Sequence, residues 1–296
     1  MSPRVYAVVE APSHLGLRAG GVELLSEALL AAGLAERLGA KRRERLAVPP
    51  FDPVVDGETR LLNPRALRDY ARQLADAVAA ALDDGEFPIV LGGDCSILLG
   101  NALALRRRGR YGLLFLDGHA DFYQPEAEPT GEAASMELAL VTGRGPEIVA
   151  NLEGRGPLMR DEDVVVFGQR DAEVAAAQGS QPLAPTIRAV DLHGVRREGA
   201  ERAAQDAIAF LDRQDGPAGF WTHLDVDVLD DAVMPAVDYR LPGGLSWGEL
   251  TAVLRTASAH DRAVGLEVTI FNPTLDPEGR TAGTLVDCLV AALAPS

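Results

Sequence analysis

The chain has little cysteine, a minority of basic residues and no long apolar run, and each shortage excludes a class of protein. Its 296 residues include two cysteines, Cys95 and Cys288, which lie far apart. This count excludes a small scaffold stabilised by disulfides and favours a reducing compartment. No run approaches the roughly 18 apolar residues that a membrane span requires, and the first residues lack the apolar region of a signal peptide. We therefore expect a cytoplasmic protein with no membrane anchor.

Acidic residues outnumber basic ones by 44 to 28, which leaves a net charge of -16. Nucleic acids and anionic membranes are polyanions, so this charge disfavours both as partners. It suits a small cationic substrate. The glycine-rich stretch 16–21 contains no G-x-G-x-x-G fingerprint, so nothing indicates a dinucleotide site.

Strands and helices alternate along the whole chain, with no repeat and no linker. The pattern predicts one α/β domain over residues 1–296, with three layers (α/β/α) and a mainly parallel sheet. Asn63 is expected to cap one helix, and Ser246 with Glu249 forms the capping-box pattern of another. The expected strands are 6–9, 87–91, 113–116, 163–167, 186–191, 219–224 and 263–268, and the expected helices are 22–33, 64–81, 97–107, 135–141, 200–211, 246–259 and 284–293.

Two apolar strands end in closely spaced polar residues. Asp117, His119 and Asp121 follow the run 113–116 at every second position, so in extended backbone all three point one way. Asp225 and Asp227 follow the later strand in the same manner. Carboxyl ends of parallel strands meet at one edge of a sheet, where crowded carboxylates repel unless a cation lies between them. A divalent-metal site is the expected result, and solvated loops are the alternative.

Three segments resemble the metal motifs of the arginase/agmatinase (ureohydrolase) family, GGDHS, DxHxD and SxDxDxxDP. They are Gly92–Ser96, Asp117–Asp121 and the stretch from Asp225 to Asp230. The resemblance covers most of the chain in the family's order. It includes Gly20–Leu24 (GVE in the family), Gln169–Asp171 (LRD), Pro235–Leu245 (ending in Gly-Gly-Leu) and Glu267–Val268 (the late acid of EV(N)P).

The resemblance implies an arginase-like hydrolase with two Mn²⁺ ions that share carboxylates and bridge a hydroxide. That hydroxide attacks a guanidinium carbon and releases urea, or a urea analogue, and an amine. Asp117 and Asp225 are expected to bridge the ions. Asp121 is expected to bind the first ion, on the Cys95 side, and to orient the hydroxide. His119 and Asp227 would bind the second ion.

The same resemblance implies the substrate contacts and the assembly. Glu267 is expected to pair with the guanidinium, Glu173 stands where the family places a carboxylate for an α-amino group, and Ser135 is a further expected substrate contact. Arg240 could meet a substrate carboxylate, although an exposed surface charge is the favoured interpretation. The family forms trimers or hexamers, so we expect a homo-oligomer.

The sequence departs from the family at its first metal ligand, where Cys95 replaces histidine. A thiolate prefers Zn²⁺ or Fe²⁺ to Mn²⁺. Three interpretations are open: Cys95 ligates a metal, it lies beside a half-empty site, or the site holds one ion. A small buried hydrophobic residue is the alternative to all three.

The second departure is a missing histidine. Ala134 occupies the position of the family's proton shuttle. The remaining candidates are His14, His193 and His223. His14 is best interpreted as a surface-loop residue. His223 stands at the serine position of the third motif and is best interpreted as a packed residue near the metal ligands. A substrate whose leaving nitrogen is less basic, such as an N-hydroxyguanidine, needs less acid assistance.

The favoured function is therefore hydrolysis of a guanidino compound: L-arginine, N-hydroxyarginine or an agmatine-like amine. Two alternatives remain. One is a formimino or amide C–N hydrolase on the same centre. The other is a degenerate, non-catalytic homologue that acts as a partner subunit, which the replacements at Cys95 and Ala134 keep open.

Overall fold

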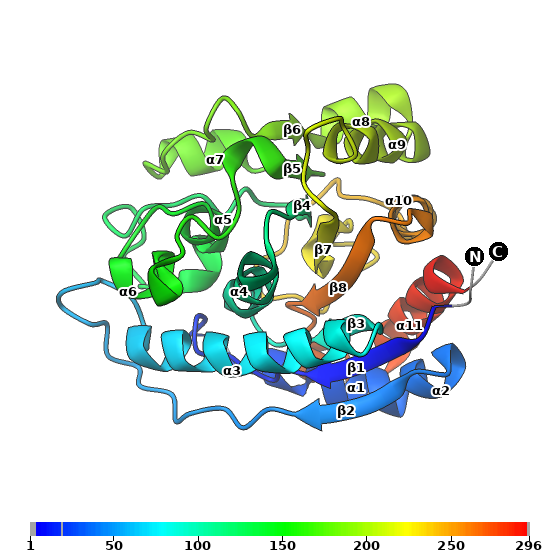
Figure 1. Cartoon of the computed structure of the whole chain (residues 1–296), viewed down its shortest axis with the longest axis horizontal. Helices are drawn as coiled ribbons and strands as arrows, with labels where there is room; N and C mark the ends of the chain where they lie inside the picture. The colour runs from blue at the N-terminus through cyan, green and yellow to red at the C-terminus, as the bar shows by residue number, and fades with distance from the viewer. Residues whose placement is uncertain (1–3, 19, 295–296) are drawn as a thin grey trace.

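Eight parallel strands form one sheet in the computed structural model, which describes residues 4–18 and 20–294 (Figure 1). Residue 19 of the glycine-rich stretch and the ends of the predicted domain, 1–3 and 295–296, lie outside the described residues. The order across the sheet is β2-β1-β3-β8-β7-β4-β5-β6. The strands are β1 (Tyr6–Glu10), β2 (Lys41–Arg45), β3 (Phe87–Leu91), β4 (Gly112–Leu116), β5 (Val164–Phe167), β6 (Arg188–Val190), β7 (Phe220–Asp225) and β8 (Ala263–Thr269).

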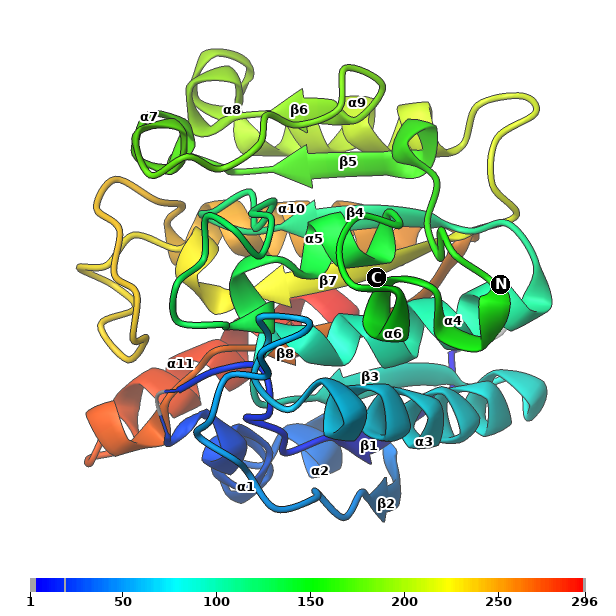
Figure 2. The ribbon, with the colours of Figure 1, turned by 90° about the vertical axis from the view of Figure 1, so that its left-hand side faces the viewer.

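Helices cover both faces of the sheet, which confirms the predicted three-layer α/β class (Figure 2). One layer, nearest the viewer in Figure 2, contains α3 (Pro64–Asp83), α4 (Leu98–Arg108), α5 (Glu137–Val141) and α6 (Glu147–Ala150). The other contains α1 (Leu25–Ala31), α2 (Leu34–Leu38), α8 (Leu192–Glu198), α9 (Ala200–Leu211), α10 (Trp247–Ala259) and α11 (Arg280–Leu293). The short helix α7 (Ala172–Ala177) follows β5.

The central strands are apolar on both sides because each side packs against a helix layer. In β4, Leu113 and Phe115 enter one hydrophobic core, whereas Leu114 and Leu116 enter the other. This alternation is the two-residue period of a strand. The continuous apolar runs that predicted the strands therefore reflect burial on two faces.

The edge strand β2 is absent from the predicted elements because its sequence is basic rather than apolar. Its side chains are largely exposed, and charged residues on an edge strand discourage pairing with another chain. Lys41 and Arg43 bond to the buried carboxylate of Glu86, and Arg42 bonds to Glu10. Buried acids therefore anchor the basic edge to the sheet.

Of the two predicted helix caps, one is confirmed, and the other is right in position but wrong in its side-chain bond. Ser246 and Glu249 form the predicted capping box of α10. Asn63 precedes α3, but its side chain does not cap the helix. Its Oδ1 accepts from the Asp52 amide at 2.7 Å and its Nδ2 donates to the Leu15 carbonyl at 2.9 Å. The asparagine joins two loops instead. Within the described ranges, no helix has the length and apolar character to cross a membrane.

Candidate metal centre

Polar residues from several strand ends meet at the carboxyl edge of the sheet, as the sequence predicts. Cys95 follows β3, Asp117 follows β4 and Asp225 ends β7. A cavity of about 730 Å³ opens over this edge. Asp117 is buried below the surface of the cavity. The other five predicted metal ligands line the cavity: Cys95, His119, Asp121, Asp225 and Asp227.

Asp117, His119 and Asp227 form one group whose ligand atoms all lie within 4.8 Å of one another. His119 Nδ1 is 2.9 Å from Asp227 Oδ2 and 3.5 Å from Asp117 Oδ1. Backbone amides hold both carboxylates in place: the His119 amide donates to Asp117 Oδ1 at 2.6 Å, and the Gly118 amide donates to Asp227 Oδ1 at 3.1 Å. These contacts bring together the ligands predicted for the second ion and fix their orientation.

The Cys95 thiol faces the same carboxylates from the other side. Its Sγ is 2.9 Å from Asp225 Oδ2 and 3.2 Å from Thr269 Oγ1. Asp225 in turn accepts a bond from the Asp227 amide at 2.7 Å. The residue is buried and belongs to a hydrophobic core, but its thiol also meets a predicted metal ligand, Asp225.

The turn that carries Cys95 is fixed by its glycines and by Asp94. The Asp94 carboxylate accepts bonds from the Ser96 amide at 2.8 Å and the Gly16 amide at 3.2 Å. A Cβ on Gly93 would lie 1.7 Å from the Ser13 carbonyl oxygen, so only glycine allows the two backbones to approach this closely. The Gly-Gly-Asp sequence therefore sets the position of the thiol.

Glu137 is a member of the centre that sequence reasoning missed. It begins α5, is fully buried, and belongs with Asp117 and Asp121 to a second group of candidate ligands. In the described part of the chain, no hydrogen-bond donor reaches either carboxylate oxygen of Glu137. Its polar neighbour is the Asp121 carboxylate, to which it can hydrogen-bond only if one of the pair carries a proton. The available signal was an acid directly preceding the apolar run Leu138–Val141.

The electrostatics of the acidic residues call for a cation. Burial raises the pKa of Asp117 and Asp225 well above the usual value, and the neighbouring carboxylates raise both further. Burial also raises the pKa of Asp121 to about 7. Burial would likewise raise the pKa of Asp227, but the charge and hydrogen bond of His119 outweigh it and lower that pKa.

The unpaired ligand atoms also fit divalent ions. Among residues 4–18 and 20–294, buried atoms without a hydrogen-bond partner include Asp117 Oδ2, both Glu137 oxygens and His223 Nε2. An unpaired buried polar group costs about 1–3 kcal/mol, and metal coordination removes that cost. Asp121 has a φ of 42°, a strained conformation for a residue with a side chain, and such strain is typical of functional sites.

Glu267 lies below the cavity rather than in its wall. It is fully buried inside β8 and accepts hydrogen bonds from Asn101, Trp221 and His223. Aligned on Asn272-Pro273, the family's late acid falls on Ile270, which does line the cavity. The structure therefore does not bring Glu267 to the position from which it was expected to meet a guanidinium.

The other two predicted substrate contacts are placed differently from each other. Ser135 lines the cavity. Glu173 is exposed on α7 and is not part of the lining, whereas its neighbours Val174 and Gln178 are. Asp171, at the start of the same helix, also lines the cavity and was not among the predicted contacts.

The histidine candidates for proton transfer lie away from the cavity. His14 is 3.4 Å from the Glu23 carboxylate and packs on Phe51, and His193 is exposed on α8. Ala134 lines the cavity. Arg240 also lines it, and bonds to the Asp231 carbonyl at 3.0 Å, so it lies at the mouth rather than among the ligands.

Comparisons with known proteins identify the family of the chain. The model of the arginase family matches residues 6–294. The arginase of Bacillus caldovelox is 30% identical over 288 residues, which span 95% of each chain. An arginase of Staphylococcus aureus (strain MSSA476) is 28% identical over 93% of this chain and 92% of its own.

Solved structures have the same fold. The arginase from Bacillus caldovelox superposes with a TM-score of 0.87 at 26% identity over 99% of both chains. The agmatine ureohydrolase of Thermoplasma volcanium superposes with a TM-score of 0.69 at 18% identity, over 98% of this chain and 90% of its own. The second likeness concerns the fold alone.

Proposed function

Because the chain belongs to the arginase family, we propose that it is a metal-dependent hydrolase that cleaves a C–N bond of a guanidino compound. The product would be urea or a urea analogue, together with an amine. The observation that carries the proposal is the acidic cavity directly above the candidate ligand groups. Seven acidic side chains and one arginine line it.

The outer acids of the cavity suit a cationic substrate. Four of the seven are not among the predicted metal ligands: Glu128, Glu132, Asp171 and Asp238. Their charge remains when ions neutralise the deeper carboxylates, so the cavity stays attractive to a cation. A carboxylate also matches the planar fork of a guanidinium with two parallel hydrogen bonds. Asp171 can do this: within residues 4–18 and 20–294, its carboxylate accepts one side-chain bond, from Gln169 to Oδ1 at 3.1 Å.

The candidate ligands divide into two sets. Asp117, His119 and Asp227 would hold one divalent ion, and Cys95 with Asp225 would contribute to the other. When bound, such ions polarise the substrate and lower the pKa of water, so that a nucleophile is available at neutral pH. Mn²⁺ is the ion expected from the family, with Zn²⁺ or Fe²⁺ favoured wherever Cys95 is a ligand.

Asp121 is the residue that we place at the proton transfer. It lines the cavity at the level of the ligand groups, where it can orient the attacking water and accept its proton. The hydroxyl of the water goes to the guanidinium carbon. The proton returns from Asp121, or through cavity water, to the departing nitrogen. No imidazole is available for this step at position 134.

Two features of the cavity wall bear on the choice of substrate. Ala134 supplies no acid for the leaving nitrogen, and Ile270 places an apolar group where the family's late acid would stand. Both favour a less basic leaving nitrogen and a less tightly ion-paired substrate than L-arginine. We therefore expect N-hydroxyguanidino compounds to be cleaved at least as well as L-arginine, with agmatine-like amines as further candidates.

The test is a substrate panel with metal-loaded protein. L-Arginine, N-hydroxyarginine, agmatine, a formimino compound and an amide would be incubated with protein loaded with Mn²⁺, Zn²⁺ or both. Urea, hydroxyurea, hydroxylamine, ammonia and formamide would be measured. We expect urea, hydroxyurea or hydroxylamine from at least one guanidino compound, abolished in Asp227→Asn and retained in the surface variant Arg202→Ala. Formamide or ammonia alone would favour the formimino or amide hydrolase instead.

The replacements at Cys95 and Ala134 also keep the non-catalytic homologue as a second candidate. Bound metal with no product from any compound would favour it. The expected trimer or hexamer stays a prediction, and light scattering of the purified protein would measure it.

A further inference from the structure

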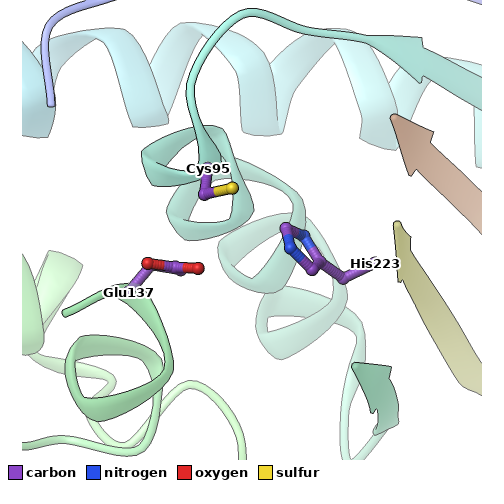
Figure 3. Close-up of side chains that lie close together, drawn as sticks. All are labelled: Cys95, Glu137 and His223. Carbon is purple, nitrogen blue, oxygen red and sulfur yellow. The ribbon is translucent and has the colours of Figure 1, made fainter. Parts of the chain in front are cut away.

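We propose that Cys95, Glu137 and His223 form a metal site that differs from the family's motifs and selects Zn²⁺ or Fe²⁺ over Mn²⁺. Their ligand atoms all lie within 4.8 Å of one another, and all three residues are buried. Figure 3 shows the side chains converging from three elements: the turn before α4, the start of α5 and strand β7. Cys95 and His223 stand where the family motifs have histidine and serine, and Glu137 belongs to none of those motifs.

The orientation of His223 is that of a metal ligand. Its Nδ1 lies 2.9 Å from Glu267 Oε1. Glu267 also accepts a bond from Trp221 Nε1 at 3.2 Å and another from Asn101. A carboxylate that receives three bonds is an acceptor, so Nδ1 carries the proton and the lone pair of Nε2 faces the site. Nε2 itself has no hydrogen-bond partner in the described part of the protein.

The chain Glu267–His223–site is the arrangement by which proteins orient metal-binding histidines. The His223 ring stacks on Phe115 with centroids 4.5 Å apart and planes 9° apart, which prevents it from turning away. This gives Glu267 a role as a positioning residue. It accounts for a carboxylate buried inside β8 without contact with the cavity.

Glu137 supplies the second observation that points to a ligand. Its side chain is fully buried, and neither oxygen meets a donor anywhere in residues 4–18 and 20–294. A buried carboxylate without a partner is costly. Simple packing of Cys95 as a small hydrophobic residue would leave both this carboxylate and His223 Nε2 unsatisfied. A cation placed among the three side chains satisfies both.

The combination of sulfur, nitrogen and oxygen donors determines which metal is preferred. Thiolate and imidazole are typical ligands of Zn²⁺ and also suit Fe²⁺, whereas Mn²⁺ favours carboxylate and water. The neighbouring group of Asp117, His119 and Asp227 has two carboxylates and one imidazole, and so suits Mn²⁺. Asp117 Oδ2 is 4.0 Å from His223 Nε2, so the two sites adjoin. The centre would then hold two different metals.

The test uses Co²⁺ as a probe of the full-length protein after its metals have been removed. Co²⁺ bound to a thiolate gives a sulfur-to-metal charge-transfer band in the near ultraviolet. We expect this band in the native protein and in Cys288→Ser, since Cys288 is buried in α11. We expect its loss in Cys95→Ser. Native protein that binds Co²⁺ without the band would overturn the proposal.

Glu137→Gln and His223→Gln test the other two ligands by affinity. Each should weaken Zn²⁺ binding in competition with a chelator dye by about 10–100-fold or more, while Mn²⁺ binding at the second site changes much less. Unchanged Zn²⁺ affinity in both variants would refute the site.

The proposed function can fail without the site failing. A charge-transfer band together with no product from the substrate panel would reject hydrolysis of those guanidino compounds and leave the metal site standing. Catalysis by protein loaded with Mn²⁺ alone, with no cobalt band and unchanged Zn²⁺ affinity in the variants, would reject the site and leave the function.

Discussion

Arg170 ties the loop that carries Asp227 to the loop at Leu241 and Pro242, so its removal should destabilise the protein measurably. The guanidinium uses all its nitrogens on backbone carbonyls of two loops. The acceptors are Asp227 (2.7 Å), Val228 (3.4 Å), Leu229 (3.0 Å), Leu241 (2.9 Å) and Pro242 (3.2 Å). The side chain is also packed against Gly118, where a Cβ would lie 2.4 Å from Arg170 Nη1.

The magnitude follows from the number of bonds and from the partial exposure of Arg170. A hydrogen bond to a charged group contributes about 1.5–3 kcal/mol, but this guanidinium is only half-buried, and water can replace part of what is lost. We therefore expect Arg170→Ala to lower the free energy of unfolding by about 2–4 kcal/mol. The corresponding fall in Tm is roughly 3–6 °C for a protein of this size. Arg170→Lys keeps the charge without the planar fork, so its free energy of unfolding should lie between those of native protein and Arg170→Ala.

The assay is urea unfolding of metal-free protein, because bound ions would add to the apparent stability. The matched control is Arg202→Ala, which removes an exposed arginine paired with Asp206 four residues along α9. Such a pair contributes about 0.3–0.5 kcal/mol. If Arg170→Ala costs no more than Arg202→Ala, the guanidinium is not what holds the two loops together.

Two further predictions concern the turn that carries the thiol and the edge of the sheet. Gly93→Ala should lower the free energy of unfolding by about 3–5 kcal/mol, because its Cβ would meet the Ser13 carbonyl oxygen and neither backbone can rotate away. A Cβ at Gly248 would have no atom within 4 Å. Gly248→Ala should therefore stabilise helix α10 by about 0.5–1 kcal/mol in the same urea titration. Burial would raise the pKa of Glu86, but hydrogen bonds from two basic residues of β2 outweigh burial and lower that pKa. The ionised carboxylate therefore stabilises the fold above pH ~4, and this stabilisation is lost as the pH falls through the lowered pKa. Glu86→Gln should therefore cost about 1–2 kcal/mol at pH 7 and progressively less below pH 4; an equal cost at both pH values would contradict the ion-pair explanation.

The sequence predicted most of the sheet and the ends of the central strands because those strands are buried on both faces. A run such as Leu113–Leu116 has no other favourable environment in a protein of this size. Asp117 and Asp225 follow such runs directly, so their meeting at one edge could be inferred from parallel pairing alone. The basic strand β2 could not be predicted this way, since its stability comes from pairing with β1 and from buried acids that are distant in sequence.

The misplacement of Glu267 has a geometric cause. The dipeptide Glu267-Val268 matches the family's late Glu-Val pair. Strand β8, however, continues to Thr269, one residue beyond the predicted end. The strand therefore reaches the cavity at Ile270, and Glu267 remains in the middle of β8 beside Trp221 and His223. Alignment on the following Asn272-Pro273 instead places the family's late acid at Ile270, which lines the cavity.

Glu137 could not be recognised from one sequence because its local pattern is ordinary. An acid in the first turn of a helix is favourable and usually solvated. Its burial arises from tertiary structure, since α5 packs against α4 at the edge of the sheet that holds the ligands. The functional importance of this residue thus depends on contacts that are distant along the chain.

The proximity of Cys95, Glu137 and His223 changes what a reversion at Cys95 should do. If the thiol were a single weakened ligand, Cys95→His would restore the family's histidine and tighten Mn²⁺ binding. Other side chains already fill the space around the thiol, however. Cys95 is buried, its Sγ lies 2.9 Å from Asp225 Oδ2, and the ligand atoms of Glu137 and His223 lie within 4.8 Å of it. An imidazole is several atoms larger than a thiol, so it would overpack this space at a cost of about 1–3 kcal/mol.

We therefore expect Cys95→His alone to lower stability without tightening Mn²⁺ binding. The double variant Cys95→His/His223→Ser removes one ring as it adds the other, and should recover much of the lost stability while shifting the metal preference from Zn²⁺ towards Mn²⁺. Urea unfolding of the metal-free proteins and competition between the two metals measure both effects. A single variant that binds Mn²⁺ more tightly than native protein, with no loss of stability, would show that Cys95 changed independently of His223 and Glu137.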